Sequence, residues 1–353
     1  MTVGRREIRQ ASDASRSDPI RQVDRFLETE IEARALALAF SRGLIDRFAG
    51  RQSVDRSELA GLAGMPENAF SFFLQLLAGN GVIRGGDPVR LTADFRDALA
   101  LRDLLEAKLW FANLVAPDVH GLFAELLSDI PEFMARAAVF ELFRYDRCLE
   151  VTPENVDAAA QWVGYTTTLS RYEAPACLDR LDLAQSSRVL DVGGNSGEFA
   201  RQICERNPSI EATVFDLPVV CALGRRHVQA TPQSARIAFC EGDLRRDPLP
   251  AGHDLISFKS VLHDWPQDDA AAFIGKAADA LDPGGKMVIF ERMPIELKGA
   301  RLPYSMVANL VFLPFFRSPD FYVGELGKHG FADIAVQFVG MEMPFALITA
   351  RKP

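Results

Sequence analysis

The sequence predicts an α/β fold in which a mostly parallel sheet carries helices on both faces. Short apolar-rich strands alternate with helical stretches through the second half of the chain, which is typical of such sheets. With 353 residues, the chain can bury a large core, and its length favours two domains. Hydrophobic residues make up 48% and charged residues 25%, as in ordinary globular proteins.

The first predicted strand ends in a glycine-rich turn. In the run VLDVGGNSG (189–197), a buried strand with the acid Asp191 turns through glycines into a helix, and glycine lets backbone N–H groups approach a ligand closely. Asn195 and Glu198 stand where a dinucleotide fingerprint has its second and third glycines, so a pyrophosphate ligand is disfavoured. Asp191 would also repel phosphate, and it suits a positively charged ligand such as S-adenosylmethionine.

Carboxylates follow the next two predicted strands. The strand 211–215 ends at Asp216, which is placed to accept both hydroxyls of a ribose. The strand 237–240 precedes Asp243, which can meet the amino group of an adenine. These positions predict a nucleoside site at the carboxyl edge of the sheet.

A histidine and a glutamate follow the two remaining parallel strands. The strand 255–258 leads into His263, a helix is predicted over 267–280, and the strand 286–290 ends at Glu291. Candidate ligand groups thus recur at the carboxyl ends of successive strands, where open α/β sheets bind their ligands. Two further strands, 334–339 and 345–350, predict an antiparallel hairpin that completes a seven-stranded sheet.

The ordered motifs VLDVGGNSG, VFDLP, EGDLRRDPLP, FKSVLHDWPQDD and LDPGGKMVIFE resemble those of the plant-type small-molecule O-methyltransferases. That family includes caffeic acid and acetylserotonin O-methyltransferases and many bacterial enzymes that tailor natural products. The resemblance extends from about residue 18 to the end of the chain. It implies a Rossmann-like class I methyltransferase sheet and an α-helical, winged-helix-like N-terminal dimerisation domain. It also implies S-adenosyl-L-methionine as cofactor and S-adenosyl-L-homocysteine as product.

The resemblance and the strand ends together give three sets of candidate site residues. The catalytic candidates are His263 as base and Glu291 as the residue that orients it. The cofactor-binding candidates are Asp191, Gly193, Gly194, Gly197, Asp216, Leu217, Asp243, Leu244, Lys259 and Ser170. The substrate-binding candidates are Trp162, Thr166, Asp264, Met306, Phe312 and Phe316. No metal site is expected, because the five cysteines are scattered and never form a C-x-x-C pair.

A histidine base matches the chemistry of methylating a phenol. A phenol ionises near pH 10, so at neutral pH it needs a base, and an imidazole with a pKa of about 6.5 is well suited. In the family pattern, a second acid supports this base. Here the loop that would carry that acid is shortened, and Phe316 occupies its place. Asp320 and Glu325 are candidates to replace it.

The acceptor is expected to be an aromatic small molecule, held in an apolar pocket that includes Met306, Phe312 and Phe316. The acceptor atom stays open, because C- or N-methylation would use the same scaffold. A relative that binds the cofactor without transferring a methyl group is a further alternative.

The N-terminal part predicts a winged-helix layout. One amphipathic helix begins near residue 20, has periodic apolar positions to residue 38 and continues to residue 48. It is followed by short helices at 57–63 and 66–78 and by a hairpin over 82–91. A DNA-binding regulator is therefore an alternative. It is disfavoured because the helix 66–78 has no Lys or Arg for phosphate contacts and the net charge is −9, which also argues against anionic membranes. The helix suits a homodimer interface instead.

The expected organisation is an arm at 1–17, a winged-helix-like dimerisation domain at 18–100, linker and substrate-pocket helices at 101–180, and a methyltransferase domain at 181–353. No apolar run reaches the length of a membrane span, and residues 1–18 have no apolar core of a secretory signal. The scattered cysteines favour a reducing compartment, so a cytoplasmic location is expected.

Overall fold

The computed structural model describes residues 18–297 and 299–353, so the predicted arm at 1–17 lies outside the described residues. The described chain divides into two compact units. One contains residues 138–296 and 312–353, and the other contains 18–137 and 297–311. The domain boundaries expected near residues 100 and 180 remain a prediction.

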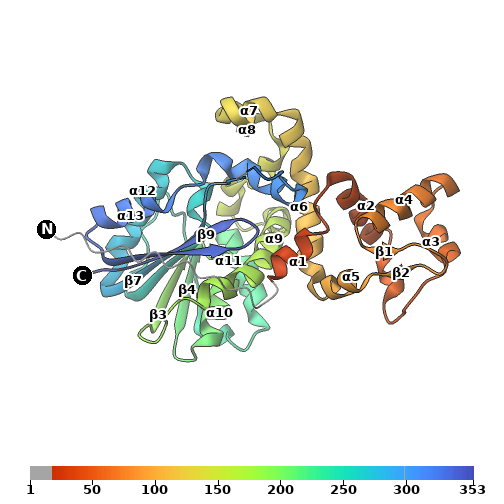
Figure 1. Ribbon diagram of the computed structural model, residues 1–353. Helices are drawn as coiled ribbons and strands as arrows, with labels where there is room; N and C mark the ends of the chain where they lie inside the picture. The colour runs from red at the N-terminus through yellow and green to blue at the C-terminus, as the bar shows by residue number, and fades with distance from the viewer. Residues whose placement is uncertain (1–17, 298) are drawn as a thin grey trace. The chain divides into compact units, whose positions relative to one another are not determined.

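The larger unit is built on the predicted seven-stranded sheet (Figure 1). Its strands are β3 (Arg188–Val192), β4 (Glu211–Asp216), β5 (Ile237–Glu241), β6 (His253–Lys259), β7 (Leu281–Arg292), β8 (Ala332–Gly340) and β9 (Pro344–Arg351). They lie in the order β5-β4-β3-β6-β7-β9-β8, and all neighbours are parallel except that β9 is antiparallel to β7 and β8. The strand order reverses between β3 and β6, and open α/β sheets bind their ligands at the carboxyl ends of the strands beside such a reversal.

Helices cover the sheet in two groups. The helices α9 (Pro153–Leu178), α10 (Glu198–Arg206) and α11 (Pro218–Gln229) pack on one another and on β3, β4 and β5. The helices α12 (Gln267–Ala280) and α13 (Pro319–Lys328) pack on each other and on β7, β8 and β9. The core between the sheet and this second group includes Ile256, Phe258, Phe273, Ile289 and Leu326.

The strand predicted at 286–290 is longer in the structure, because β7 begins at Leu281. The register between β6 and β7 shifts between the pairs His253–Leu281 and Leu255–Lys286. The extra residues form a bulge in β7, where Gly284 takes the left-handed φ of +76°.

The smaller unit begins with the predicted order of helices and hairpin. Its first elements are α1 (Pro19–Asp24), α2 (Glu30–Ser41), η1 (Ile45–Phe48), α3 (Arg56–Ala63), α4 (Glu67–Gly79), β1 (Ile83–Arg84) and β2 (Arg90–Leu91). The single helix predicted from residue 20 is wrong, because the chain leaves helical structure between α1 and α2. Asn80 donates a side-chain hydrogen bond of 3.0 Å to the carbonyl of Phe26 in this break. The break lets the consecutive residues Phe26 and Leu27 both be buried.

The remaining helices of this unit are α5 (Ala93–Ala98), η2 (Leu99–Leu101), α6 (Arg102–Gly121), α7 (Phe123–Ser128) and α8 (Ile130–Arg136). Pro117 lies inside α6 and does not end the helix. A proline inside a helix removes one backbone hydrogen bond. The burial of Val115, Ala116 and Val119 on one face of α6 stabilises the helix and offsets that loss of free energy. None of the helices in the described part of the chain is both long enough and apolar enough to cross a membrane.

Short 3-10 segments connect the elements around the site. They are η3 (Ala138–Glu141), η4 (Tyr145–Leu149), η5 (Ser234–Arg236), η6 (Leu262–Asp264) and η7 (Tyr304–Phe315).

Candidate active site

The turn after β3 has room only for glycine at two consecutive positions. Gly193 has a φ of +64°, and an added Cβ would lie 2.9 Å from methyl groups of Val261. A Cβ at Gly194 would lie 2.5 Å from Oδ2 of Asp191. At Gly197, where α10 begins, the φ is +76°. Glycine at these positions therefore lets the turn pack closely against Val261 and Asp191.

Asp191 is buried beneath this turn with one carboxylate oxygen unsatisfied. Ser257 donates a hydrogen bond of 2.8 Å to its Oδ1, whereas its Oδ2 has no hydrogen-bond partner in the described structure. Burial raises the pKa of Asp191 to about 7, although the Ser257 hydroxyl and the charge of Lys259 lower it. A buried polar atom without a partner is costly, so this oxygen suits a donor supplied by a ligand.

Asp216 faces the glycine turn from the end of β4. Its carboxylate accepts backbone N–H hydrogen bonds from Asn195 and Leu217, both of 2.8 Å. Burial raises its pKa to about 6, and these two N–H groups oppose that shift. Asp216 therefore joins the turn to the start of α11, where Leu217 precedes the first helical residue.

Asp243 and Leu244 already have partners within the chain. Arg245 binds the carboxylate of Asp243 through Nε, Nη2 and its backbone N–H at 2.9–3.0 Å. Burial acts to raise the pKa of Asp243, but the bonds from Arg245 outweigh it and hold the pKa below its usual value. The side chain of Leu244 lies in the core of the sheet.

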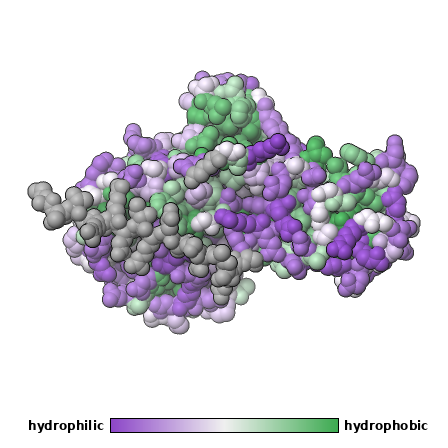
Figure 2. Space-filling model, in the orientation of Figure 1, coloured by the Kyte–Doolittle hydropathy of each residue, from purple (hydrophilic) through white to green (hydrophobic). Residues whose placement is uncertain are grey.

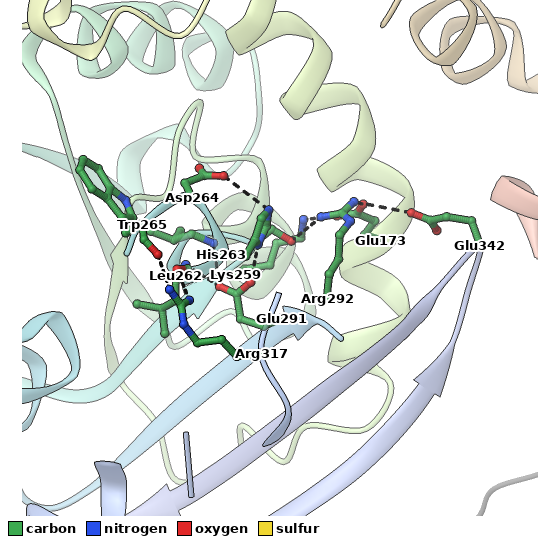
Figure 3. A network of polar contacts seen from close by, with 12 residues as sticks. Glu173, Lys259, Leu262, His263, Asp264, Trp265, Glu291, Arg292, Arg317 and Glu342 are labelled. Atoms are coloured by element: carbon green, nitrogen blue, oxygen red, sulfur yellow. Dashed lines mark hydrogen bonds and ion pairs between the residues drawn. The ribbon is translucent and has the colours of Figure 1, made fainter. Parts of the chain in front are cut away.

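Lys259, at the end of β6, is part of a buried charge network that sequence reasoning missed (Figure 3). Its ammonium donates to Ser170 at 3.2 Å and to Glu173, both on α9. Glu173 also binds Arg292 at the end of β7, and Arg292 lies 3.6 Å from Glu342. Glu173 lies among the helices predicted at 101–180, and no motif in the sequence marks it as a partner of Lys259.

His263 and Glu291, which the sequence paired, are brought together at the ends of β6 and β7 (Figure 3). His263 Nδ1 lies 2.5 Å from Glu291 Oε2, and both side chains are buried. The other oxygen, Oε1, accepts the backbone N–H groups of Val261 and Leu262 at 2.8 and 2.7 Å. Because the carboxylate accepts from Nδ1, the hydrogen lies there and Nε2 keeps its lone pair. That arrangement suits a general base.

Arg317 fixes the backbone on both sides of this histidine. Its guanidinium donates to the carbonyl of Leu262 at 2.8 Å and to the carbonyl of Trp265. Sequence reasoning gave Arg317 no role, because nothing along the chain relates the 313–320 loop to the segment that follows β6. The base is thus held by a carboxylate at its ring and by a guanidinium at its backbone.

Aromatic rings cover the exposed side of the imidazole. The centroids of Phe312 and Phe316 both lie 5.6 Å from that of His263, the first edge-on at 86° and the second tilted at 46°. Phe316 therefore places an apolar ring where the family pattern has an acid. Glu325, a candidate to replace that acid, pairs with Lys328 on its own helix at 2.7 Å.

The aromatic lining continues through residues that sequence reasoning did not select. Tyr145 stacks on Trp265 with centroids 5.8 Å apart, and its ring also lies 5.8 Å from that of Trp162. Phe143 lies 6.1 Å from both Trp162 and Phe312. Phe143 and Tyr145 both lie in the irregular segment before α9. No periodic pattern in that segment indicates which of its side chains are buried.

Two substrate candidates lie elsewhere. Thr166 on α9 accepts a hydrogen bond of 2.8 Å from Asn195, which places it beside the glycine turn. Met306 is buried in the smaller unit, where the Asn309 amide lies 3.5 Å from its sulfur. Across the described residues, no cluster of three or more His, Cys, Asp or Glu side chains is arranged to hold a metal ion.

The sheet order, the glycine turn and the carboxylates at the strand ends define an α/β protein of the class I methyltransferase fold. Residues 148–315 match the model of the O-methyltransferase domain.

Similar proteins include several O-methyltransferases. The chain is 35% identical over 130 residues to 3-hydroxy-5-methyl-1-naphthoate 3-O-methyltransferase of Streptomyces sahachiroi, covering 37% of each chain. It is 31% identical over 191 residues to demethylspheroidene O-methyltransferase of Rhodobacter capsulatus, covering 52% of this chain and 46% of that one. The matches thus span less than half the length of these relatives. The structure of human N-acetylserotonin methyltransferase is similar in fold, with a TM-score of 0.74, 22% identity and coverage of 96% of this chain and 99% of that one.

Proposed function

We propose that this protein is an S-adenosylmethionine-dependent O-methyltransferase that methylates a hydroxyl of an aromatic small molecule. The observation that carries the proposal is the buried His263–Glu291 pair, lined by aromatic rings at the same sheet edge as the glycine turn. The name of the naphthoate enzyme supports an aromatic acceptor, and the names of the naphthoate and spheroidene enzymes support methylation at oxygen.

The residues around the turn fit the cofactor. The unsatisfied Oδ2 of Asp191 suits its ammonium group. Asp216 would accept the ribose hydroxyls. The remaining proposed contacts are Gly193, Gly197, Leu217, Asp243, Leu244, Lys259 and Ser170.

When bound, the cofactor supplies an electrophilic methyl group on a sulfonium, and the protein supplies alignment and a base. His263 Nε2 takes the proton of the acceptor hydroxyl, while Glu291 holds Nδ1–H and stabilises the imidazolium that results. Phe312 and Phe316 exclude water from the imidazole and offer their faces to a flat acceptor.

Product mass after incubation with S-adenosylmethionine and a panel of phenolic metabolites tests the proposal. A gain of one methyl group, located on oxygen by NMR, is expected. Methylation at carbon or nitrogen would support the first alternative. Binding of S-adenosylhomocysteine with no methylated product would support a non-methylating relative.

Cofactor affinity is expected to rise with pH through about 7, because burial holds the pKa of Asp191 there. Below that pH the side chain is neutral, and above it a carboxylate attracts the ammonium of the ligand. Calorimetry with S-adenosylhomocysteine between pH 5.5 and 8.5 measures this, and proton release on binding should appear in buffers of different ionisation enthalpy. Asp191→Asn should bind more weakly and lose the pH step. A flat profile in the wild type would contradict the assignment.

We also propose that the smaller unit is a winged-helix-like dimerisation domain. The helix α4 has no cation and exposes Phe72 by 59%, and α2 exposes Ile31 by 61%. Figure 2 shows apolar side chains over α7 and α8, where Phe123 and Leu127 are half exposed or more. Apolar surface of this extent favours a partner, and a second copy of the chain is the simplest one.

Light scattering at micromolar concentration is expected to give twice 39.0 kDa. A monomer would rule out the dimer, and salt-dependent binding of duplex DNA would instead favour the regulator. The five free cysteines agree with a cytoplasmic location, which we propose as well.

A further inference from the structure

Arg245, in the turn that follows β5, makes three hydrogen bonds to one carboxylate. Its backbone N–H and its Nε donate to Oδ1 of Asp243, both at 3.0 Å, and its Nη2 donates to Oδ2 at 2.9 Å. The side chain of Asp243 is 6% exposed, whereas that of Arg245 is 37% exposed. A two-pronged contact with a guanidinium fixes the plane of a carboxylate as well as its charge.

The turn itself is anchored on two neighbouring elements. The backbone N–H of Gly242 donates to the carbonyl of Asp216 at 3.0 Å, which joins the turn to the end of β4. Lys276 on α12 donates to the carbonyl of Leu244 at 2.6 Å. The backbone that carries Asp243 is therefore tied to that of Asp216, the acid proposed to accept the ribose hydroxyls.

An aromatic ring supports the guanidinium of Arg245. Its Cζ lies 5.4 Å from the ring centroid of Trp265, within the range of a cation–π contact. Trp265 is held in turn by Tyr145, which stacks on it at 5.8 Å, and by Phe273, which meets it edge-on at 5.4 Å. Because Trp265 follows His263 by two residues, Arg245 links the turn after β5 to the segment that carries the proposed base.

The contact with Arg245 leaves one acceptor position of Asp243 open. A carboxylate has about four lone-pair positions. Within the described part of the chain, Oδ1 accepts two hydrogen bonds and Oδ2 accepts one. Arg246 Nε lies 3.6 Å from Oδ2, too far for a hydrogen bond, and the Arg246 side chain is 73% exposed. Oδ2 is thus able to accept one donor from a ligand.

We propose that Arg245 is the positioning residue that makes the cofactor site selective for an aminopurine, because it holds the Asp243 carboxylate in one orientation against Trp265. This proposal rests on the proposed S-adenosylmethionine-dependent function. The amino group of an adenine would donate to Oδ2 of Asp243. A hypoxanthine would place a carbonyl oxygen there, and two acceptors that face each other leave both without a hydrogen bond.

The test compares S-adenosylhomocysteine with S-inosylhomocysteine, which has a carbonyl oxygen in place of the amino group. Calorimetry on the full chain should show that the wild type binds the adenosyl compound about tenfold to a hundredfold more tightly, as a hydrogen bond to a charged group predicts. Arg245→Met keeps an unbranched apolar side chain but removes both side-chain donors, so it should bring the two affinities close together. Arg246→Met is the matched control, and it should keep the wild-type preference.

The charges around this carboxylate and guanidinium come from three elements. On the turn itself, Arg246 lies 3.6 Å from the carboxylate, and Asp247 accepts the backbone N–H of Asp243 at 2.7 Å. The bond to Asp243 raises the pKa of the guanidinium, and the charges of Asp269 on α12 and Asp146 on η4 act in the same direction. Burial acts to raise the pKa of Asp243, but the bonds from the guanidinium and the charge of Arg246 hold it below its usual value.

The pH dependence of the preference separates positioning from a merely structural role of Arg245. The preference needs the carboxylate of Asp243, so the wild type should lose it only as pH falls through a pKa that lies below the usual value. In Arg245→Met, the side-chain hydrogen bonds that favour the charged form are gone while burial remains. This variant should therefore lose its residual preference at a higher pH than the wild type, whereas Arg246→Met should follow the wild type closely.

Failure of this proposal can be told apart from failure of the proposed function. A wild type that binds the adenosyl and inosyl compounds equally well would overturn the selectivity alone, whereas a wild type that binds neither would overturn the proposed function. A full preference in Arg245→Met, with native thermal stability, would overturn the role of Arg245. Arg245→Lys serves as the second variant, because it keeps the charge without the two-pronged contact, and it should show a preference between those of Arg245→Met and the wild type.

Discussion

Replacing His263 with alanine is expected to lower turnover by about 10²–10⁴, the range of general-base catalysis. The reason is that Nε2 is the proton acceptor we propose, and Glu291, at 2.5 Å from Nδ1, would hold the imidazole in the tautomer that leaves Nε2 free to accept. Cofactor affinity should stay nearly unchanged, since His263 binds Glu291 and lies among aromatic rings rather than at the glycine turn. Turnover and calorimetry on the same preparation measure both quantities.

His263→Gln is the matched control, because glutamine can hydrogen-bond a hydroxyl but cannot remove its proton. It should be almost as slow as His263→Ala. Glu291→Gln should lose less turnover than His263→Ala. This variant also weakens the hydrogen bonds that Glu291 accepts from the backbone N–H groups of Val261 and Leu262. If His263→Ala keeps more than about a tenth of wild-type turnover, the base role is wrong and alignment alone explains the rate.

Asp216→Ala should weaken cofactor binding by about 2–4 kcal/mol, as expected for the loss of charge-assisted hydrogen bonds. The carboxylate would accept the ribose hydroxyls and also accepts the N–H of Asn195, so its loss affects both the ligand and the turn. Calorimetry with S-adenosylhomocysteine measures the change.

Asp216→Asn keeps the size of the side chain and most of the turn geometry, so it isolates the effect of the charge. A thermal melt of each variant shows whether the fold is retained. Wild-type affinity in Asp216→Ala would remove the ribose assignment, and tight binding of NAD instead of S-adenosylhomocysteine would remove the cofactor proposal.

The sequence alone determined the sheet and the edge at which the candidate site lies. Buried parallel strands are near-continuous apolar runs, and their carboxyl ends share one edge, so the order of residues along the chain is enough to group those that follow successive strands. Asp216 at the end of β4 binds the turn that follows β3, and His263 after β6 meets Glu291 near the end of β7, as that rule predicts.

The tertiary structure alone decided which side chains surround that edge. Tyr145 meets Asp264 across 119 residues, Lys259 meets Glu173 across 86, and Arg317 reaches the backbone of Leu262 across 55. Tyr145 and Arg317 lie in irregular segments, where no periodicity indicates which face is buried, and Glu173 is an acid in a helix that would ordinarily face solvent. Only packing brings these groups to the base, because a buried carboxylate or guanidinium is stable only where its partner is already placed.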